Sequence, residues 1–187
     1  FELSLQADQS FNPAQTQRSF HLGLRDVFEA TILPPLLKTI TKQAPGISIA
    51  SVRVDLGGRR TTKKNSNLDM VLEVPIPLAG NIRQQRVSRD RLMVLSRNGH
   101  PQIPRKKNSL LDLSTYLQQA HVLVSSRRQG MGLEDFELNR EGLRRHISLR
   151  CQHYFAACRV VSETDLLLTM PEQYASIANA QFMNRVD

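Results

Sequence analysis

The sequence predicts an α/β fold built as two lobes. Segments with the period-two pattern of strands alternate along the chain with segments that carry helix signals, and this series occurs twice. Hydrophobic residues make up 40% of the 187 residues and charged residues 22%, which is typical of a folded globular protein. No apolar run approaches the roughly 18 residues that a membrane-spanning helix needs. We therefore expect a folded protein with no membrane partner.

The first lobe is expected to contain a strand, a helix and two further strands. Alternating apolar residues at 20–24 indicate a strand, and Asp26 is well placed to cap a helix that runs to Gln43. Further strands are predicted at 47–54 and 68–74. Strands that are joined through a helix in this order favour a right-handed parallel unit.

The second lobe repeats this alternation. Strands are predicted at 91–97, 121–125, 146–149 and 165–169, and helices at 108–119, 133–139, 153–162 and 170–178. Asp112 or Ser109 is expected near the start of the first of these helices, and Gly142 is well placed to end the second. The last strand and helix are expected to return to the first lobe and extend its sheet.

The formal charge of the chain is +8, and its basic residues concentrate between 81 and 110, where Asp90 is the one acid. Such a charge favours anionic partners, although a solvated basic face is the simpler interpretation. The same stretch has no aromatic side chain on which a base could stack. Direct binding of nucleic acid by these residues is therefore not expected.

Two cysteines, Cys151 and Cys158, lie in an apolar stretch. A small secreted protein held by disulfides would carry more, and the spacing of the pair with His153 does not match a zinc site. We therefore expect both thiols to pack in the core, in a protein of a reducing compartment. The sequence predicts no metal and no cofactor.

No catalytic constellation is evident. The sequence has no Gly-x-Ser-x-Gly elbow, no Walker glycine loop and no His-Glu-x-x-His motif. Cys151 and His153 are two residues apart where a strand is expected to give way to a helix, so they would face different ways. Asp69, Glu73 and Asp165 have no evident partner. The chain is therefore not expected to be an enzyme.

A small-ligand site at the ends of strands is the best functional candidate. In open α/β sheets, ligands bind beyond the carboxyl ends of strands, where helix N-termini supply N–H donors. Hydroxyl, guanidinium, imidazole and aromatic groups follow three predicted strands, the mix expected for a small organic anion. Ordinary helix caps and surface loops are the alternative. The candidate ligand-binding residues are Arg25, Asp26, Val27, Phe28, Ser125, Ser126, Arg127, Met131, His153, Tyr154 and Phe155.

Several segments resemble the effector domain of LysR-type transcriptional regulators. The resemblance rests on RSFHLGLRD at 18–26, LPPLL at 33–37, APG at 44–46, NLDMVL at 67–72, GHP at 99–101, GLRR at 142–145, HYFAA at 153–157 and TDLLLTMP at 164–171. It covers about residues 10–180. Within the family, the sequence is most similar to the regulators of nodulation and of naphthalene or salicylate degradation.

This resemblance implies a periplasmic-binding-protein-like fold, in which two Rossmann-like lobes are joined by a double crossover and enclose an inducer cleft. Residues 1–17 would be a linker from an absent N-terminal winged-helix domain. Lobe I would comprise 18–88 plus 164–187, with its C-terminal part incomplete, and lobe II would comprise 89–163. The family also implies a cytoplasmic homodimer within a tetramer, which touches DNA only through the absent domain.

The predicted function is therefore ligand sensing: a small, anionic organic inducer binds between the lobes and controls DNA binding and transcription by the full-length oligomer. A transport-type solute-binding protein with the same two lobes is the alternative. Two features depart from the family pattern. Residues 56–66 carry paired glycines and four basic residues where the family has an amphipathic helix. Met131 replaces a histidine, and because methionine cannot donate a hydrogen bond, a salicylate-like inducer is disfavoured.

Overall fold

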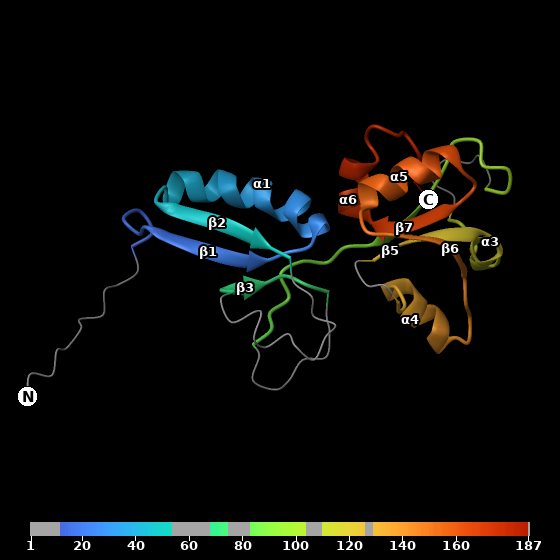
Figure 1. The fold of residues 1–187 in the computed structure, drawn as a ribbon, viewed down its shortest axis with the longest axis horizontal. Helices are drawn as coiled ribbons and strands as arrows, with labels where there is room; N and C mark the ends of the chain where they lie inside the picture. Colours follow the sequence, from blue (N-terminus) through green and yellow to red (C-terminus); the bar gives the residue numbers. More distant parts are fainter. Residues whose placement is uncertain (1–11, 54–67, 75–82, 104–109, 126–128, 187) are drawn as a thin grey trace, which may run out of the picture. The chain divides into compact units, whose positions relative to one another are not determined.

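The structure, a computed structural model, describes residues 12–53, 68–74, 83–103, 110–125 and 129–186 (Figure 1). Its contacts divide the chain into two units, Phe1–Gly80 and Asn81–Asp187. The departure from the family pattern at 56–66 lies outside the described residues. In the described ranges, no helix has both the length and the apolar character that crossing a bilayer would require.

Unit 1 is a small parallel α/β unit, as the sequence predicts. It contains β1 (Arg18–Gly23), α1 (Asp26–Gln43), β2 (Ile47–Val52) and β3 (Met70–Val71), and the strand order is β2-β1-β3. Both neighbours of β1 run parallel to it. The helix α1 lies on one face of this sheet (Figure 1). The third strand is shorter than the predicted 68–74.

The residues that flank α1 differ in part from those that the sequence predicts. Arg25, not Asp26, occupies the N-cap position and provides no side-chain cap, which corrects the expected role of Asp26. Asp26 is instead the first helical residue, where a carboxylate still interacts favourably with the helix dipole. At the other end, a Cβ on Gly46 would lie 2.6 Å from the Thr16 carbonyl oxygen. Glycine at position 46 therefore permits the close approach of two backbone segments.

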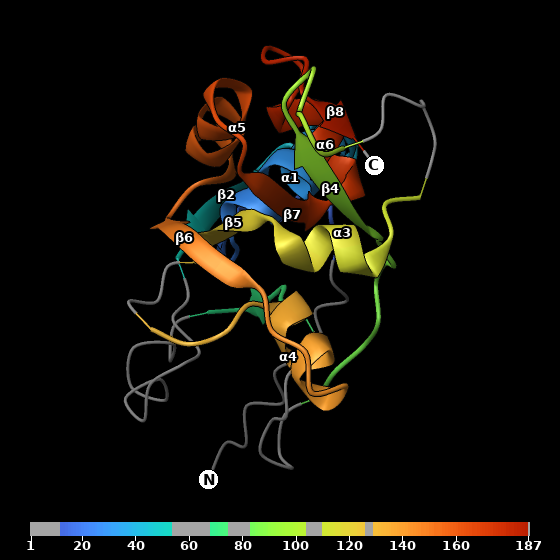
Figure 2. The same cartoon turned by 90° about the vertical axis from the view of Figure 1, so that its right-hand side faces the viewer.

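Unit 2 is built on a mixed five-stranded sheet. Its strands are β4 (Leu92–Ser96), β5 (Ala120–Val124), β6 (His146–Cys151), β7 (Leu167–Pro171) and β8 (Arg185–Val186), in the order β6-β5-β7-β4-β8. Its helices are α3 (Leu113–Gln118), α4 (Leu133–Arg140), α5 (Tyr154–Glu163) and α6 (Glu172–Ala178). The strand β5 runs parallel to β6 and β7, whereas β4 runs antiparallel to β7 and β8. In both views α5 and α6 lie on one side of this sheet and α4 on the other (Figure 2).

Local signals set two helix ends in unit 2 as expected. The Asp112 carboxylate caps α3 by accepting from the Thr115 N–H at 2.9 Å. Hydrogen bonds from Ser114 and Thr115 lower the pKa of Asp112 below its usual value. Beyond α4, Gly142 has a φ of 71°, which glycine adopts at low cost.

The structure corrects the expected return of 164–187 to the first sheet. In β7, Leu168 pairs with Leu95 of β4 on one side and with Val122 of β5 on the other, so this strand lies inside the second sheet. The connection from Glu163 to Leu167 is short, and a right-handed crossover through α5 places β7 beside β5. Each unit is thus one continuous stretch of chain.

The centre of unit 2 is apolar and holds one of the cysteines. Leu95, Leu167, Leu168 and Met170 have no exposed surface, and neither does Cys158 on α5. Both cysteines are free thiols, and burial raises the pKa of Cys158 to about 11. Burial also raises the pKa of Cys151. Both thiols are therefore protonated near neutral pH, which agrees with packing rather than nucleophilic chemistry.

Replacing Leu168 by alanine should lower the free energy of unfolding by about 2–5 kcal/mol, because it removes a fully buried side chain from an interior strand. Leu110→Ala is the matched control, since that leucine is 98% exposed and its loss should change stability by less than about 0.5 kcal/mol. Denaturant titration of both variants measures the difference. Equal effects would contradict the position of β7.

Candidate functional site

The carboxyl ends of β5 and β6 lie side by side in unit 2. The Ser125 N–H donates to the Cys151 carbonyl oxygen at 2.8 Å, directly beyond the last paired residues of the two parallel strands. The segments that follow them leave from the same edge of the sheet. Of the predicted site residues, the structure thus brings Ser125 close to the turn that contains His153 and Tyr154. Ser126 and Arg127 lie outside the described residues.

The helix α5 begins at this edge. His153 is its N-cap residue and its side chain makes no capping hydrogen bond. The N–H groups of the first turn of a helix have no intrahelical acceptor, and together with the helix dipole they favour a negative charge. The start of α5 therefore supplies the kind of donor that the ligand hypothesis requires.

The predicted aromatic residues at this turn pack against the end of the chain. The Tyr154 ring lies edge-on to Tyr174 at 5.6 Å between centroids, and Phe155 lies edge-on to Phe182 at 5.1 Å. Phe155 remains half exposed. Their orientation is therefore set within unit 2 by α6 and the segment after it.

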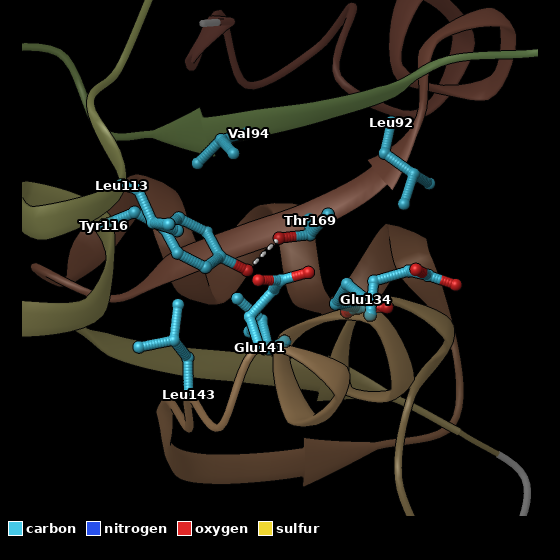
Figure 3. A pocket seen from close by; sticks show the side chains of 10 residues that line it. Leu92, Val94, Leu113, Tyr116, Glu134, Glu141, Leu143 and Thr169 are labelled. Atoms are coloured by element: carbon cyan, nitrogen blue, oxygen red, sulfur yellow. Dashed lines mark hydrogen bonds between the residues drawn. The ribbon is translucent and has the colours of Figure 1, made fainter.

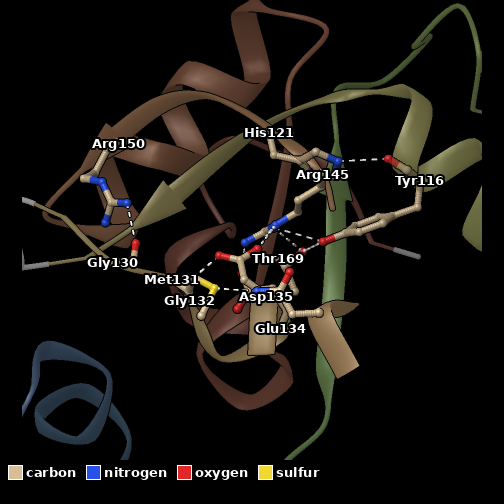
Figure 4. A network of polar contacts seen from close by, with 11 residues as sticks. Tyr116, His121, Gly130, Met131, Gly132, Glu134, Asp135, Arg145, Arg150 and Thr169 are labelled. Carbon is tan, nitrogen blue, oxygen red and sulfur yellow. Dashed lines mark hydrogen bonds and ion pairs between the residues drawn. The ribbon is translucent and has the colours of Figure 1, made fainter. Parts of the chain in front are cut away.

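Arg150, the penultimate residue of β6, is a cation that sequence reasoning missed. One guanidinium nitrogen, Nη2, donates to the Gly130 carbonyl oxygen at 2.6 Å (Figure 4). The other, Nη1, is buried and has no hydrogen-bond partner among the described residues. Because buried donors are rarely unpaired in native structures, this nitrogen is a candidate contact for an anion. The place of Arg150 directly after the predicted strand 146–149 was the available sequence signal.

A buried ion cluster holds the residue directly before α4. The Arg145 side chain is 1% exposed; its Nε donates to Asp135 at 2.6 Å and its Nη2 to Glu134. Asp135 in turn accepts from the Gly132 N–H at 2.6 Å, ahead of the first residue of α4 (Figure 4). The cluster therefore joins Arg145, next to β6, to the segment that carries Gly130 and Met131.

The same arginine reaches the other side of α4. Its Nη1 donates to the Tyr116 hydroxyl at 2.9 Å, and that hydroxyl lies 2.8 Å from the Thr169 Oγ1. Burial by itself lowers the pKa of Arg145, but the hydrogen bond to Asp135 and the charge of Glu134 outweigh it and raise the pKa. Burial raises the pKa of Asp135, and the Arg145 hydrogen bond more than offsets this and leaves it lowered. Arg145 and Asp135 therefore stay charged.

His121 lies beside this cluster as a buried neutral imidazole. Its Nε2 donates to the Tyr116 carbonyl oxygen at 2.9 Å, and the two rings lie 4.4 Å apart between centroids and are tilted by 57° to each other. Burial lowers the pKa of His121 to about 4. Since Nε2 carries the proton, Nδ1 is an acceptor, and it has no partner among the described residues.

Unit 1 groups the remaining predicted residues at the carboxyl end of β1. Arg25, Asp26, Val27 and Phe28 form the start of α1, directly after that strand. Arg25 is not an unpaired cation, because its Nη1 lies 3.1 Å from Glu73. This pair weakens the expected role of Arg25 as an anchor for an anion.

The carboxylates without an evident partner in the sequence are all paired. Glu73 pairs with Arg25, Asp69 pairs with Arg18 at 2.9 Å, and Asp165 pairs with Arg97 at 2.5 Å. The backbone hydrogen bond from His21 and the charge of Arg18 lower the pKa of Asp69 despite partial burial. These groups stabilise the fold. Among the described residues, no group of three or more His, Cys, Asp or Glu side chains could hold a metal ion.

Two α/β units with polar loops at the carboxyl ends of their strands define a ligand-binding domain of the periplasmic-binding-protein-like class. Residues 13–183 match the family described as the LysR substrate binding domain. The chain belongs to this family, and the resemblance drawn from its motifs is confirmed.

The relatives of this chain are transcription regulators. It is 28% identical over 174 residues to the HTH-type transcriptional activator NagR of a Ralstonia species, and 30% identical over 172 residues to the HTH-type transcriptional activator NahR of Pseudomonas putida. These alignments cover 93% and 92% of this chain but 56% of each relative. The chain thus spans about half the length of the curated relatives it matches.

Solved structures have the same fold. The probable transcriptional regulator PA0477 from Pseudomonas aeruginosa superposes with a TM-score of 0.79 at 26% identity, over 94% of this chain and 59% of that one. The effector binding domain of QuiR, solved in complex with shikimate, superposes with a TM-score of 0.71 at 17% identity, over 91% of this chain and 80% of that one. The predicted α/β fold class is confirmed.

Removing the buried cation should be far more costly than removing an exposed one. We expect Arg145→Met to lower the free energy of unfolding by about 3 kcal/mol or more, because it leaves Glu134 and Asp135 without their counterion. Arg140→Met, which breaks an exposed pair with Glu137, should cost about 0–1 kcal/mol. Denaturant titration compares the two, and similar losses would contradict a structural role for the cluster.

The buried histidine predicts a loss of stability in mild acid. The unfolded chain takes up a proton at His121 near pH 6.5, whereas the folded chain resists protonation until about pH 4. The unfolded state binds more protons between these values, so His121 should destabilise the fold by roughly 3 kcal/mol in total as the pH falls through them.

His121→Phe should remove this part of the pH dependence. The measurement is a series of denaturant titrations from pH 7 to pH 4 on both proteins. Equal slopes of stability against pH would show that His121 is not a buried neutral imidazole.

Proposed function

We propose that this chain is the ligand-sensing part of a LysR-type transcription regulator and that it binds a small, anionic organic inducer. The observation that carries the proposal is the edge of unit 2 where Ser125, the start of α5 and the unsatisfied Arg150 nitrogen come together. Family membership supports it, as does the bound shikimate in the related QuiR domain, a small organic acid.

We place the unit 2 part of the proposed inducer site at the carboxyl ends of β5 and β6. In unit 2, Ser125, Arg150 and the first turn of α5 hold an acidic head group, while Met131 and Phe155 contact its apolar body. The predicted residues at the start of α1 in unit 1, among them Phe28, stay a prediction. Ser126, Arg127 and His153 complete the predicted set. Arg25 contributes less, since Glu73 already neutralises it.

The proposed mechanism is a shift between two arrangements of the regulator. A ligand changes such an equilibrium only if it binds one arrangement more tightly than the other. In the full-length protein, this change would reach DNA through an N-terminal winged-helix domain, in a cytoplasmic homodimer or tetramer. A transport-type solute-binding protein would have the same fold, but the relatives, which are transcriptional activators, favour a regulator.

The test starts with a thermal-shift screen of small organic acids on this chain. Any hit is then titrated by calorimetry against Arg150→Gln and against Arg159→Gln, which removes an exposed arginine of α5. Losing a charged hydrogen bond should weaken binding at least about tenfold in Arg150→Gln. The Arg159→Gln variant should bind like the parent protein.

Two outcomes would contradict the proposed function. One is a screen in which no small organic acid binds. The other is a hit that binds Arg150→Gln as tightly as the parent, which would place the ligand away from the ends of β5 and β6.

A further inference from the structure

A hollow lies within unit 2, on the side of the sheet where α4 lies. Its volume is about 380 Å³, within the range of roughly 300–1,000 Å³ that is usual for small-molecule sites. It is lined by Leu92, Val94, Leu113, Tyr116, Glu134, Glu137, Leu138, Glu141, Leu143 and Thr169. These residues come from β4, α3, β7 and the region of α4 (Figure 3). The described residues that line the hollow all belong to unit 2.

The hydroxyl groups of Tyr116 and Thr169 line the hollow and together offer one free hydrogen-bond donor. Tyr116 and Thr169 are each 8% exposed, their oxygens lie 2.8 Å apart, and both accept from the Arg145 Nη1. One hydroxyl hydrogen lies between the two oxygens. The second has no acceptor among the described residues, whichever group donates first. Burial raises the pKa of Tyr116, so its hydroxyl keeps the proton. A nearly buried donor thus remains for an oxygen in the hollow.

The charged lining disfavours an anion. Glu134, Glu137 and Glu141 contribute carboxylates, and no basic side chain lines the described hollow. Arg145 reaches the hydroxyl pair, but its charge is already matched by Glu134 and Asp135. Glu134 uses Oε1 for Arg145, while its Oε2 has no hydrogen bond among the described residues. The hollow therefore offers one acceptor, Glu134 Oε2, and one donor, the remaining hydroxyl hydrogen of the Tyr116–Thr169 pair. The glutamate carboxylates give it a negative electrostatic potential.

We propose that this hollow binds a neutral, largely apolar small molecule that carries a hydroxyl group, such as a phenol. The ligand oxygen accepts the remaining hydrogen of the Tyr116–Thr169 pair, and its own hydrogen is donated to Glu134. Leu92, Val94 and Leu138 surround the apolar body. Carboxylic acids are rejected by the glutamates, so this second site selects against the anions that the proposed inducer site favours.

The test uses NMR titration of this chain with 4-ethylphenol and with 4-ethylbenzoate, which share a ring and differ in charge at pH 7. We expect 4-ethylphenol to perturb residues around the hollow and to bind at least about tenfold more tightly there than 4-ethylbenzoate. Arg150→Gln should bind 4-ethylphenol like the parent, which separates this site from the proposed inducer site.

A matched pair of variants locates the site. Leu113 and Leu133 each begin a helix and are 50% and 46% exposed, but Leu113 alone of the two lines the hollow. Leu113→Trp should fill the hollow and weaken 4-ethylphenol binding at least about fivefold, whereas Leu133→Trp should leave it within about twofold. The proposal is overturned if 4-ethylphenol does not bind, if 4-ethylbenzoate binds equally well at the hollow, or if both tryptophan variants behave alike.

Discussion

The buried charge of Arg145 is the constraint on which the functional part of unit 2 depends. Its guanidinium is removed from water, and the cost of that removal is large unless every donor finds a partner. Asp135 and Glu134 of α4, Tyr116 of α3 and Thr169 of β7 supply those partners. Because the partners belong to different elements, satisfying one side chain fixes α4, α3 and the sheet together.

The two binding sites that we propose in unit 2 have opposite preferences for charge. Toward the carboxyl ends of β5 and β6, Asp135 accepts from the Gly132 N–H, and Arg150 Nη2 donates to the Gly130 carbonyl oxygen. The other nitrogen of Arg150, Nη1, has no partner among the residues that the structure describes. On the side of α4, the arginine is neutralised and carboxylates line the hollow. Arg150, which has no carboxylate partner among the described residues, favours an anion. Arg145 is neutralised by Glu134 and Asp135, so the hollow beside it favours a neutral hydroxyl group.

Local sequence patterns predicted the elements well but could not place all of them. The helix α1 was expected from Asp26 to Gln43 and has these bounds, although Asp26 is not its cap. The cap of Asp112 and the glycine at 142 act as expected. The position of β7 was missed, because a strand that is buried on both faces fits any sheet and only the short connection after α5 decides between them. The Arg145 cluster forms through contacts between segments that are distant in the sequence, so no local pattern encodes it. The same holds for the surroundings of Arg150 Nη1, which has no partner among the described residues.

Hydrogen exchange of the backbone amides, with and without a small organic acid found to bind, tests the central claim most directly. The proposed inducer site predicts slower exchange in the segments that end β5 and β6, around Ser125, Gly130 and the first turn of α5, and also at the start of α1. Slower exchange at the ends of β5 and β6 would support the proposed site in unit 2. Exchange rates in these segments that do not change on ligand binding would contradict the account.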